Sequence, residues 1–259
     1  MKLRLKPGFV FFVFLCFFPL TPSTSSAVRP FFITEDAIPI ERGKSRLETG
    51  ISFQRYDSDD RRFPWVVDFT QGVINNLDFG VSVPVIFKSG RDSSDGIGDI
   101  RIKSKLRFLK GREANPLSLS SQLFIKFPSC DRSKNLSPEC TGEPDVGLIG
   151  IASKEFFPIL VHLNLGYVLT GNPNNQSFRD VFQYSLAFDI LTVIDPLHVI
   201  AELAGETQRN PSQPTDSVAV QFGALYQLIS ALSIDGSFGF GLTDASPDVF
   251  VNTGVTYRF

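Results

Sequence analysis

The sequence predicts an all-β protein, an antiparallel β-barrel of twelve strands that spans a membrane, with ten or fourteen strands as the alternatives. Three observations predict this fold. Apolar and polar residues alternate with a period of two along most of the chain, so that each strand has one apolar and one polar face. The connections between strands alternate between long, polar stretches and short ones. The chain also ends in a strand whose last residue is aromatic, Phe259.

The first 27 residues differ in character from the rest of the chain. Three cations precede an apolar run over residues 9–20, and small residues follow at 25–27, which together predict a secretory signal peptide at 1–27. The run is too short to span a bilayer comfortably, because a transmembrane helix needs about 20 apolar residues. Cys16 follows two bulky residues and lies inside the run, which argues against a lipid anchor there. We therefore expect an exported protein.

The mature chain divides into a short N-terminal segment and the barrel. Residues 28–43 contain Pro30, Pro39 and charged side chains, and we expect them to hang in the periplasm or to lie in the mouth of the lumen. The barrel is predicted over 44–259, where no apolar run is long enough for a transmembrane helix. The predicted strands match the roughly 9 to 11 residues that a tilted strand needs to cross a bilayer. They are 44–56, 63–71, 77–85, 98–109, 116–127, 143–154, 159–170, 179–190, 197–206, 217–228, 231–242 and 248–259.

A secreted β-sandwich would also give alternating strands, because it buries one face of each sheet and wets the other. Three features favour the membrane barrel. The apolar faces are continuous and carry few charges, whereas the polar faces combine opposite charges with Gly and Ser, which suits a watery lumen. The last strand is apolar at every second position up to Phe259. In lipid an open sheet edge would leave backbone groups unpaired, so the last strand must pair with the first.

Composition and charge exclude several functions. The formal charge is −2 for the whole chain. Removing the signal peptide leaves 22 basic and 27 acidic side chains, a formal charge of −5. This balance gives no electrostatic support for a nucleic-acid partner. Gly96-Ile97-Gly98 could suggest a phosphate-binding loop, but Arg101 stands where the dinucleotide fingerprint has glycine, so we interpret it as a loop that leads into a strand.

Cys130 and Cys140 are the cysteines of the mature chain, ten positions apart in a polar stretch between two predicted strands. In an exported protein this spacing favours a disulfide that closes a surface loop. Two free thiols are the less favoured alternative, and a metal site would need further ligands that the neighbouring sequence lacks. No metal and no cofactor are predicted.

Some outer-membrane barrels of this size are lipid hydrolases, so the two histidines are considered as candidate catalytic bases. His162 and His198 both fall among the lumen-facing positions, and neither has a Ser two positions away on its own face. A lipid-cleaving site needs a nucleophile and a base within hydrogen-bond reach on the bilayer side. We therefore expect no enzyme, with a lipid hydrolase as the second alternative function.

The candidate functional residues are charged side chains that the alternation places inside the barrel. One predicted strand carries four cations at alternate positions, which we call the basic ladder, and the next strand can extend it. Several carboxylates fall on inward faces at the other side of the barrel, which we call the acidic wall. The two could set a field across a water-filled lumen and select solutes by charge and size. Alternatively, they could form a salt-bridge network that closes the lumen. The ladder is Arg101, Lys103, Lys105 and Arg107, extended by Lys126, and the wall is Asp189, Glu202, Glu206 and Asp235.

The terminal Tyr257-Arg258-Phe259, with apolar residues at every second position before it, resembles the signature by which outer-membrane proteins are handed to the barrel-assembly machinery. The resemblance implies that Tyr257 and Phe259 form an assembly signal. It also implies a location in the outer membrane of a Gram-negative bacterium, with outer-membrane lipid and the assembly machinery as partners.

Two further motifs lie near the start of the barrel. They are Thr34-Glu35-Asp36-Ala37 followed by Pro39, Gly43, Arg46, Leu47 and Glu48, and Gly96-Ile97-Gly98-Asp99 leading into Lys103, Lys105 and Leu106. Together they resemble the family of transporters of the MetA pathway of phenol degradation. That resemblance implies an outer-membrane barrel for small organic molecules. It does not supply the pairing of Cys130 with Cys140.

The sequence therefore predicts a passive outer-membrane channel for small organic solutes, aromatic or anionic ones among them. Twelve strands enclose a narrower lumen than the 16 to 18 strands of general porins, so only small solutes would pass. The alternative is a structural or adhesive barrel with a closed lumen. Loops of at most about fifteen residues argue against a large adhesive surface.

Overall fold

The computed structural model describes residues 33–56, 61–89, 95–112, 115–130, 140–172, 177–192, 194, 196–212 and 215–259. The predicted signal peptide at 1–27 and the first residues after it lie outside these ranges. Within them, no helix is both long enough and apolar enough to cross a membrane.

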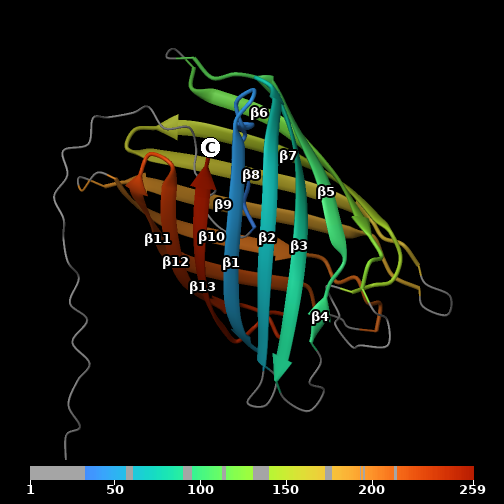
Figure 1. Cartoon of the computed structure of the whole chain (residues 1–259). Coiled ribbons are helices and arrows are strands. Elements are labelled where there is room, and N and C mark those ends of the chain that lie inside the picture. Colours follow the sequence, from blue (N-terminus) through green and yellow to red (C-terminus); the bar gives the residue numbers. More distant parts are fainter. Residues whose placement is uncertain are drawn as a thin grey trace, which may run out of the picture.

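The described chain forms one antiparallel sheet that closes into a barrel (Figure 1). Neighbouring long strands pair in sequence order, and β1 also pairs with β13, with Arg46 opposite Arg258. Twelve strands therefore form the ring, and the short β4 pairs only with β3. The strands are β1 (Ser45–Arg55), β2 (Arg61–Ile74), β3 (Leu77–Ser89), β4 (Gly96–Ile97), β5 (Ile100–Leu109), β6 (Leu117–Phe127), β7 (Asp145–Phe156), β8 (Ile159–Leu169), β9 (Val181–Leu191), β10 (Leu197–Glu206), β11 (Ser217–Ile229), β12 (Leu232–Gly241) and β13 (Val249–Arg258). This confirms the predicted twelve-stranded antiparallel barrel.

The ring is closed up to the last residue of the chain. The Ser45 amide donates to the Phe259 carbonyl at 2.7 Å, and the Phe259 amide donates to the Ser45 carbonyl at 3.0 Å. Because an unpaired backbone group in hydrocarbon costs several kcal/mol, this closure is what allows the sheet to lie in lipid. Phe259 is therefore part of the closing hydrogen-bond ladder.

The barrel has two unlike ends. The connections 75–76, 110–116, 157–158, 192–196 and 230–231 are short and define the short-turn end. The connections at the opposite, long-loop end are mostly longer and include 128–144. In outer-membrane barrels the short turns face the periplasm. By that rule the start of β1 and the end of β13, which are neighbours in Figure 1, both lie at the periplasmic end.

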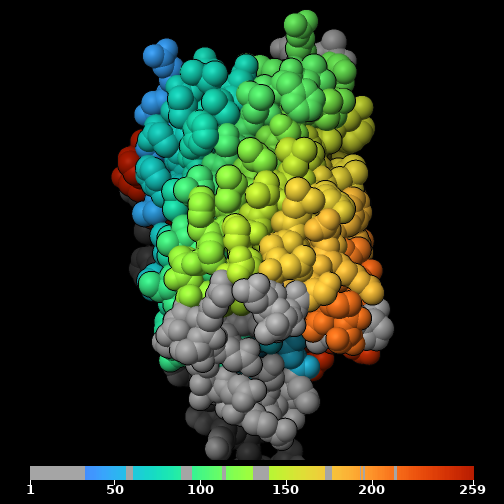
Figure 2. Space-filling view, turned by 90° about the vertical axis from the view of Figure 1, so that its right-hand side faces the viewer, coloured from blue at the N-terminus to red at the C-terminus, as the bar shows by residue number. Residues whose placement is uncertain are grey.

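The two faces of the sheet differ in chemistry as the alternation predicts. On β13 the outward Val251, Val255 and Tyr257 are exposed, whereas the inward Asn252 and Thr256 are buried. The same pattern recurs along the other strands, and Figure 2 shows part of the resulting outer surface over the strands coloured green to orange. Such an extensive exposed apolar surface would not be stable in water, but it suits the hydrocarbon of a membrane.

The strand boundaries differ from the prediction mainly in the hairpin formed by β2 and β3. β2 spans 61–74 instead of 63–71, and β3 ends at 89 instead of 85. Both strands extend through charged residues such as Arg61 and Lys88 at the long-loop end, where the ladder continues from Arg61 opposite Ser89. The apolar alternation ends earlier than the strands there, because pairing continues beyond the outward apolar surface.

Candidate functional site

The described chain begins inside the barrel. Residues 33–43, here called the N-terminal segment, run from the short-turn end to the middle of the strands. At the short-turn end the Gly43 amide donates to the Gly72 carbonyl at 3.0 Å, and the φ of +79° at Gly43 turns the chain into β1. At the inner end Thr34 contacts Glu202, halfway along β10. The segment therefore lies deeper than the lumen mouth, and Thr34, Asp36 and Ala37 are each at most 1% exposed.

Two cations of the basic ladder hold the first carboxylate of this segment. Both side chains point inward from β5 and are buried. The Lys105 ammonium donates to Glu35 Oε2 at 3.1 Å and to the Asp36 carbonyl at 3.0 Å. The Lys103 ammonium lies 3.5 Å from the other oxygen, Glu35 Oε1. Glu35 therefore bridges the two lysines with one oxygen each.

Lys103 also reaches a carboxylate two strands away. Its Nζ lies 2.9 Å from Asp68 Oδ2 on β2, although β3 lies between β2 and β5. Gly80 of β3 makes this possible, because a Cβ there would lie 2.9 Å from Lys103 Cε and 2.9 Å from Thr70 Oγ1. The glycine thus leaves the path that the lysine side chain takes across the inner wall.

The acidic wall contacts the same segment from the other side. Glu202 accepts hydrogen bonds from the Thr34 amide at 2.7 Å, from the Thr34 hydroxyl and from Gln221. Asn164 of β8 meets the backbone of Glu35. In the amide orientation that satisfies both groups, Asn164 donates to the Glu35 carbonyl at 2.9 Å and accepts from its amide at 2.6 Å. The segment is therefore held from both sides of the lumen.

Ser153 and His162 form a hydrogen-bonded pair on the inner wall that contacts the N-terminal segment at Ala37. Ser153 Oγ accepts from the Ala37 amide at 2.9 Å and lies 2.8 Å from His162 Nδ1, while Ser120 donates to the Ala37 carbonyl. Ser153 and His162 are direct partners across β7 and β8. The pair faces the lumen and is buried, so it does not provide a hydrolase site on the bilayer side.

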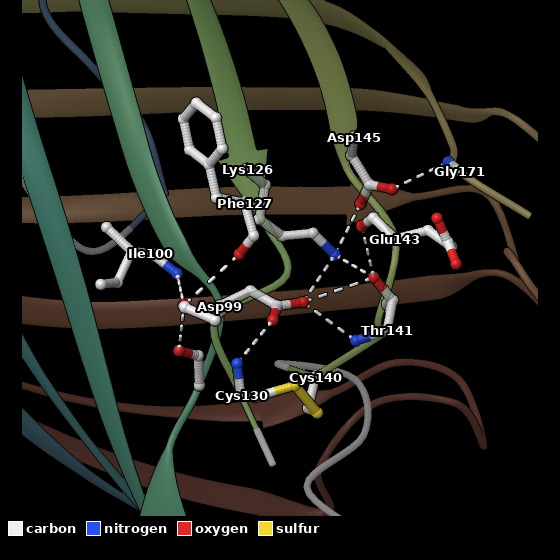
Figure 3. Close-up of polar contacts among 12 residues, drawn as sticks. Asp99, Ile100, Lys126, Phe127, Cys130, Cys140, Thr141, Glu143, Asp145 and Gly171 are labelled. Atoms are coloured by element: carbon white, nitrogen blue, oxygen red, sulfur yellow. Dashed lines mark hydrogen bonds and ion pairs between the residues drawn. A yellow bond between two sulfur atoms is a disulfide. The ribbon is translucent and has the colours of Figure 1, made fainter. Parts of the chain in front are cut away.

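A second charged cluster lies at the long-loop end, next to the disulfide between Cys130 and Cys140 (Figure 3). The Lys126 ammonium lies 2.7 Å from Asp145 Oδ2 and 3.3 Å from Asp99 Oδ2. Asp99 in turn accepts from the Cys130 amide at 3.4 Å. The Cys130 side of the disulfide-closed loop is thus tied to the barrel wall.

Further contacts complete this cluster. The Thr141 amide, next to the disulfide, also donates to Asp99, at 3.0 Å. Arg209, from the connection between β10 and β11, donates to Asp145 at 2.9 Å. Asp99 and Asp145 are buried carboxylates that share Lys126 of β6, and Arg209 adds a second cation at Asp145, so the barrel wall and one connection neutralise this end.

The remaining predicted lumen residues have other partners, although Arg101 stands directly opposite Lys126 across β5 and β6. The Arg101 guanidinium lies over the Phe124 ring at 4.4 Å, and Arg107 donates to the short turn at Asn76 at 3.2 Å. Asp189 lies 2.9 Å from His198 Nδ1, on neighbouring strands. Glu206 accepts from Gln183 at 2.9 Å near the long-loop end, and the Asp235 carboxylate lies against Gly254 on β13. These five residues do not gather into one site.

The residues of the predicted assembly signal lie on the outer face. Tyr257 and Phe259 are 46% and 58% exposed, and their rings stack with centroids 5.5 Å apart. Phe69 of β2 lies 6.5 Å from the Phe259 ring. Two aromatic side chains therefore remain accessible from the lipid side at the short-turn end.

Several residues of the site were not singled out in the sequence. Glu35 and Asp36 stand in a motif that carried only a resemblance, and Asp68 and Asp78 occupy inward positions of predicted strands. The alternation could have found the last two, because it places both on the polar face. The pairing of Glu35 with the ladder had no periodic signal, since the segment precedes the first strand.

Comparisons with known proteins agree with this architecture. The family described as "Putative MetA-pathway of phenol degradation" matches residues 24–259. The COG4313 outer membrane channel from Pseudomonas putida F1 is similar in structure, with a TM-score of 0.71 at 13% identity, covering 86% of this chain and 98% of that one. The NanC porin gives a TM-score of 0.58 at 7% identity, covering 83% and 100%. The KdgM porin in complex with disordered oligogalacturonate gives 0.54 at 12%, covering 83% and 99%. No functionally curated protein matches the chain.

Proposed function

We propose that this protein is a channel through which small organic solutes cross the outer membrane passively. The chain belongs to the family described as "Putative MetA-pathway of phenol degradation". The solved structures that resemble it are an outer-membrane channel and porins. At 7 to 13% sequence identity, this likeness is evidence for the fold only. The solute class is therefore inferred from the side chains that line the lumen.

The observation that carries the proposal is how the lumen is filled. The described part of the N-terminal segment leads into β1 and contacts the inner wall through hydrogen bonds and ion pairs to inward side chains such as Lys105, Ser153 and Glu202. Contacts of this kind can exchange with water and solute, which a core of interlocked strand side chains cannot do as easily. We infer that permeation requires the segment to leave its site, and that the segment acts as the gate.

The polar and charged inner face favours the passage of small polar or anionic organic solutes. A neutral apolar solute would form few favourable interactions with these side chains. The predicted roles of the basic ladder and the acidic wall in permeation are part of this proposal. Arg101 is exposed near the long-loop end, where its guanidinium covers the buried Phe124 ring and a solute entering from that end would meet its charge.

A structural barrel with a closed lumen is the second candidate. It is favoured by the burial of Lys103, Lys105 and Glu202, each of which has a partner of opposite charge or a hydrogen-bond donor or acceptor inside the barrel. If the network never opens, it would stabilise the barrel without passing solute.

Single-channel recording separates the two candidates. Purified full-length mature protein in planar bilayers should give discrete conductance steps with frequent closures, because the segment can re-enter its site. Liposomes that contain the protein should swell in small organic solutes. A closed structural barrel would give neither steps nor swelling.

A further inference from the structure

The contact between Glu35 and the ladder has the geometry of a ligand in a binding site. One carboxylate oxygen lies 3.1 Å from Lys105 Nζ and the other 3.5 Å from Lys103 Nζ. All three side chains are at most 8% exposed. Charge-assisted hydrogen bonds of this kind are stronger than neutral ones, and two donors that converge on one carboxylate also fix its position.

We propose that Lys103 and Lys105 form a binding site for the carboxylate of a small organic acid, and that Glu35 occupies this site as an internal substitute for the solute. The proposal rests on the proposed channel function and deepens it. It names the solute class as small carboxylates and makes the solute a competitor of the gate.

The space between Lys103 and Lys105 accepts a carboxylate in addition to those on the neighbouring strands. Asp68 lies 2.9 Å from Lys103, and Asp78 stands directly opposite Lys105 across β3 and β5, yet a further carboxylate, that of Glu35, still fits between the lysines. When the segment leaves, the lysines lose that carboxylate and remain in a narrow lumen. Lys103 keeps its ion pair with Asp68. Lys105 instead loses the Glu35 carboxylate and the Asp36 carbonyl, the two acceptors of its ammonium. A buried ammonium that loses its acceptors is costly, so a carboxylate of similar size is favoured in place of Glu35.

The segment contains the features that competition requires. Ile33, two residues before Glu35, is 53% exposed, so solvent reaches the lumen beside this part of the segment. Displacing Glu35 removes the two ion pairs that join the segment to the ladder. The contacts nearer β1, such as that of the Ile40 amide with Asp78 at 2.8 Å, can then open in turn.

A thiol placed in the segment reports its release. Ile38 is half-buried, and Ile38→Cys adds a thiol to a mature chain whose Cys130 and Cys140 are bonded to each other. The labelling rate by the neutral reagent methyl methanethiosulfonate is measured on the folded protein in detergent, with heat-modifiable mobility as the check on folding. The probe is sodium propionate, which matches the Glu35 side chain. Propionamide is its neutral counterpart, and sodium chloride at equal ionic strength is the reference.

We expect 100 mM propionate to raise the labelling rate about threefold, because a ligand that binds only the released state shifts the equilibrium by 1 + [L]/Kd, here for a Kd of about 50 mM. Propionamide and chloride should leave the rate unchanged. Glu35→Gln should raise the basal rate about tenfold or more, the factor for losing one charged hydrogen bond. Lys105→Gln should abolish the response to propionate.

The matched control is Glu41→Gln in the same segment. Glu41 is exposed, and the Lys44 ammonium 2.7 Å away lowers its pKa by a hydrogen bond and by its charge. Because this pair lies in water and outside the lumen, the control should label at the rate of the parent and respond to propionate equally.

Equal acceleration by propionate, propionamide and chloride would overturn the carboxylate site, as would equal basal rates for Glu35→Gln and Glu41→Gln. The labelling assay does not need conduction. Failure there with normal single-channel steps removes this inference alone, whereas a propionate response without any steps removes the channel function.

Discussion

Gly72→Ala should open the lumen, because Gly72 lies where the N-terminal segment passes closest to the barrel wall. A Cβ at this position would lie 2.5 Å from the Ile40 carbonyl oxygen and closer still to that of Glu41. Real Cβ atoms essentially never approach a backbone oxygen within 3.0 Å, and neither partner is a flexible side chain. The segment must therefore move away from β2.

The size of the effect follows from the contacts that this movement breaks. The Gly43 amide donates to the Gly72 carbonyl at 3.0 Å, and the Ile40 amide donates to the Asp78 carboxylate at 2.8 Å. A neutral hydrogen bond contributes about 0.5 to 1.5 kcal/mol and one to a charged group about 1.5 to 3 kcal/mol. Losing both costs about 2 to 4.5 kcal/mol, which shifts the equilibrium between the seated and released segment by about 30-fold to 1500-fold.

The assay compares single-channel open probability for the parent, Gly72→Ala and Gly150→Ala. The last is the matched control, because a Cβ at Gly150 would have its nearest neighbour at 3.7 Å, the Leu165 carbonyl oxygen. We expect longer open times and larger mean conductance for Gly72→Ala only. If Gly72→Ala forms a folded barrel and its open probability equals that of both other proteins, the segment is not the gate.

Three further outcomes are expected. A cysteine at Asp244, in the loop before β13, should be labelled on intact cells, and one at Asn76 only after permeabilisation, because long loops of outer-membrane barrels face outward; labelling in the reverse order would invert the orientation. Replacing Cys130 and Cys140 by Ser should leave heat-modifiable barrel unchanged, since both ends of the loop are already tied to strands and lose little freedom on closing; a lower yield of folded barrel would contradict this. Deletion of Phe259 should reduce assembled barrel while export continues, because this residue both closes the ladder with Ser45 and carries the predicted assembly signal; a normal level in the outer-membrane fraction would contradict it.

The strands could be predicted from the sequence because a barrel in lipid leaves no choice of register. A shift by one residue on β5 would place Lys103 and Lys105 in hydrocarbon, at a cost of about 2 to 4 kcal/mol each near the midplane. The alternation therefore fixes which side chains point inward. It identified the lumen-facing candidates without any information on their partners.

The partners could not be predicted in the same way. Lys103 reaches Asp68 over Gly80, which depends on the order of three strands and on a missing side chain. Glu35 reaches the ladder from a segment with no period, so its position depends on tertiary contacts alone. A signal was nevertheless present, because two adjacent carboxylates stand just before a barrel whose strand β5 has four cations at alternate positions.

The two charged clusters differ in a way that locates the movable part of the lumen. At the long-loop end Lys126 pairs with Asp145, its direct neighbour across β6 and β7, and Arg209 from the connection between β10 and β11 pairs with the same carboxylate, so Asp145 is neutralised without the N-terminal segment. In the half of the barrel nearer the short turns, the carboxylate of Glu35 on the N-terminal segment pairs with Lys103 and Lys105 of β5. A twelve-stranded barrel is wider than the eight strands that side chains alone can fill, so this half needs either water or an inserted chain. The segment and water or solute are therefore alternatives for the same space, and exchange between them is expected beside the lysines and not at the disulfide.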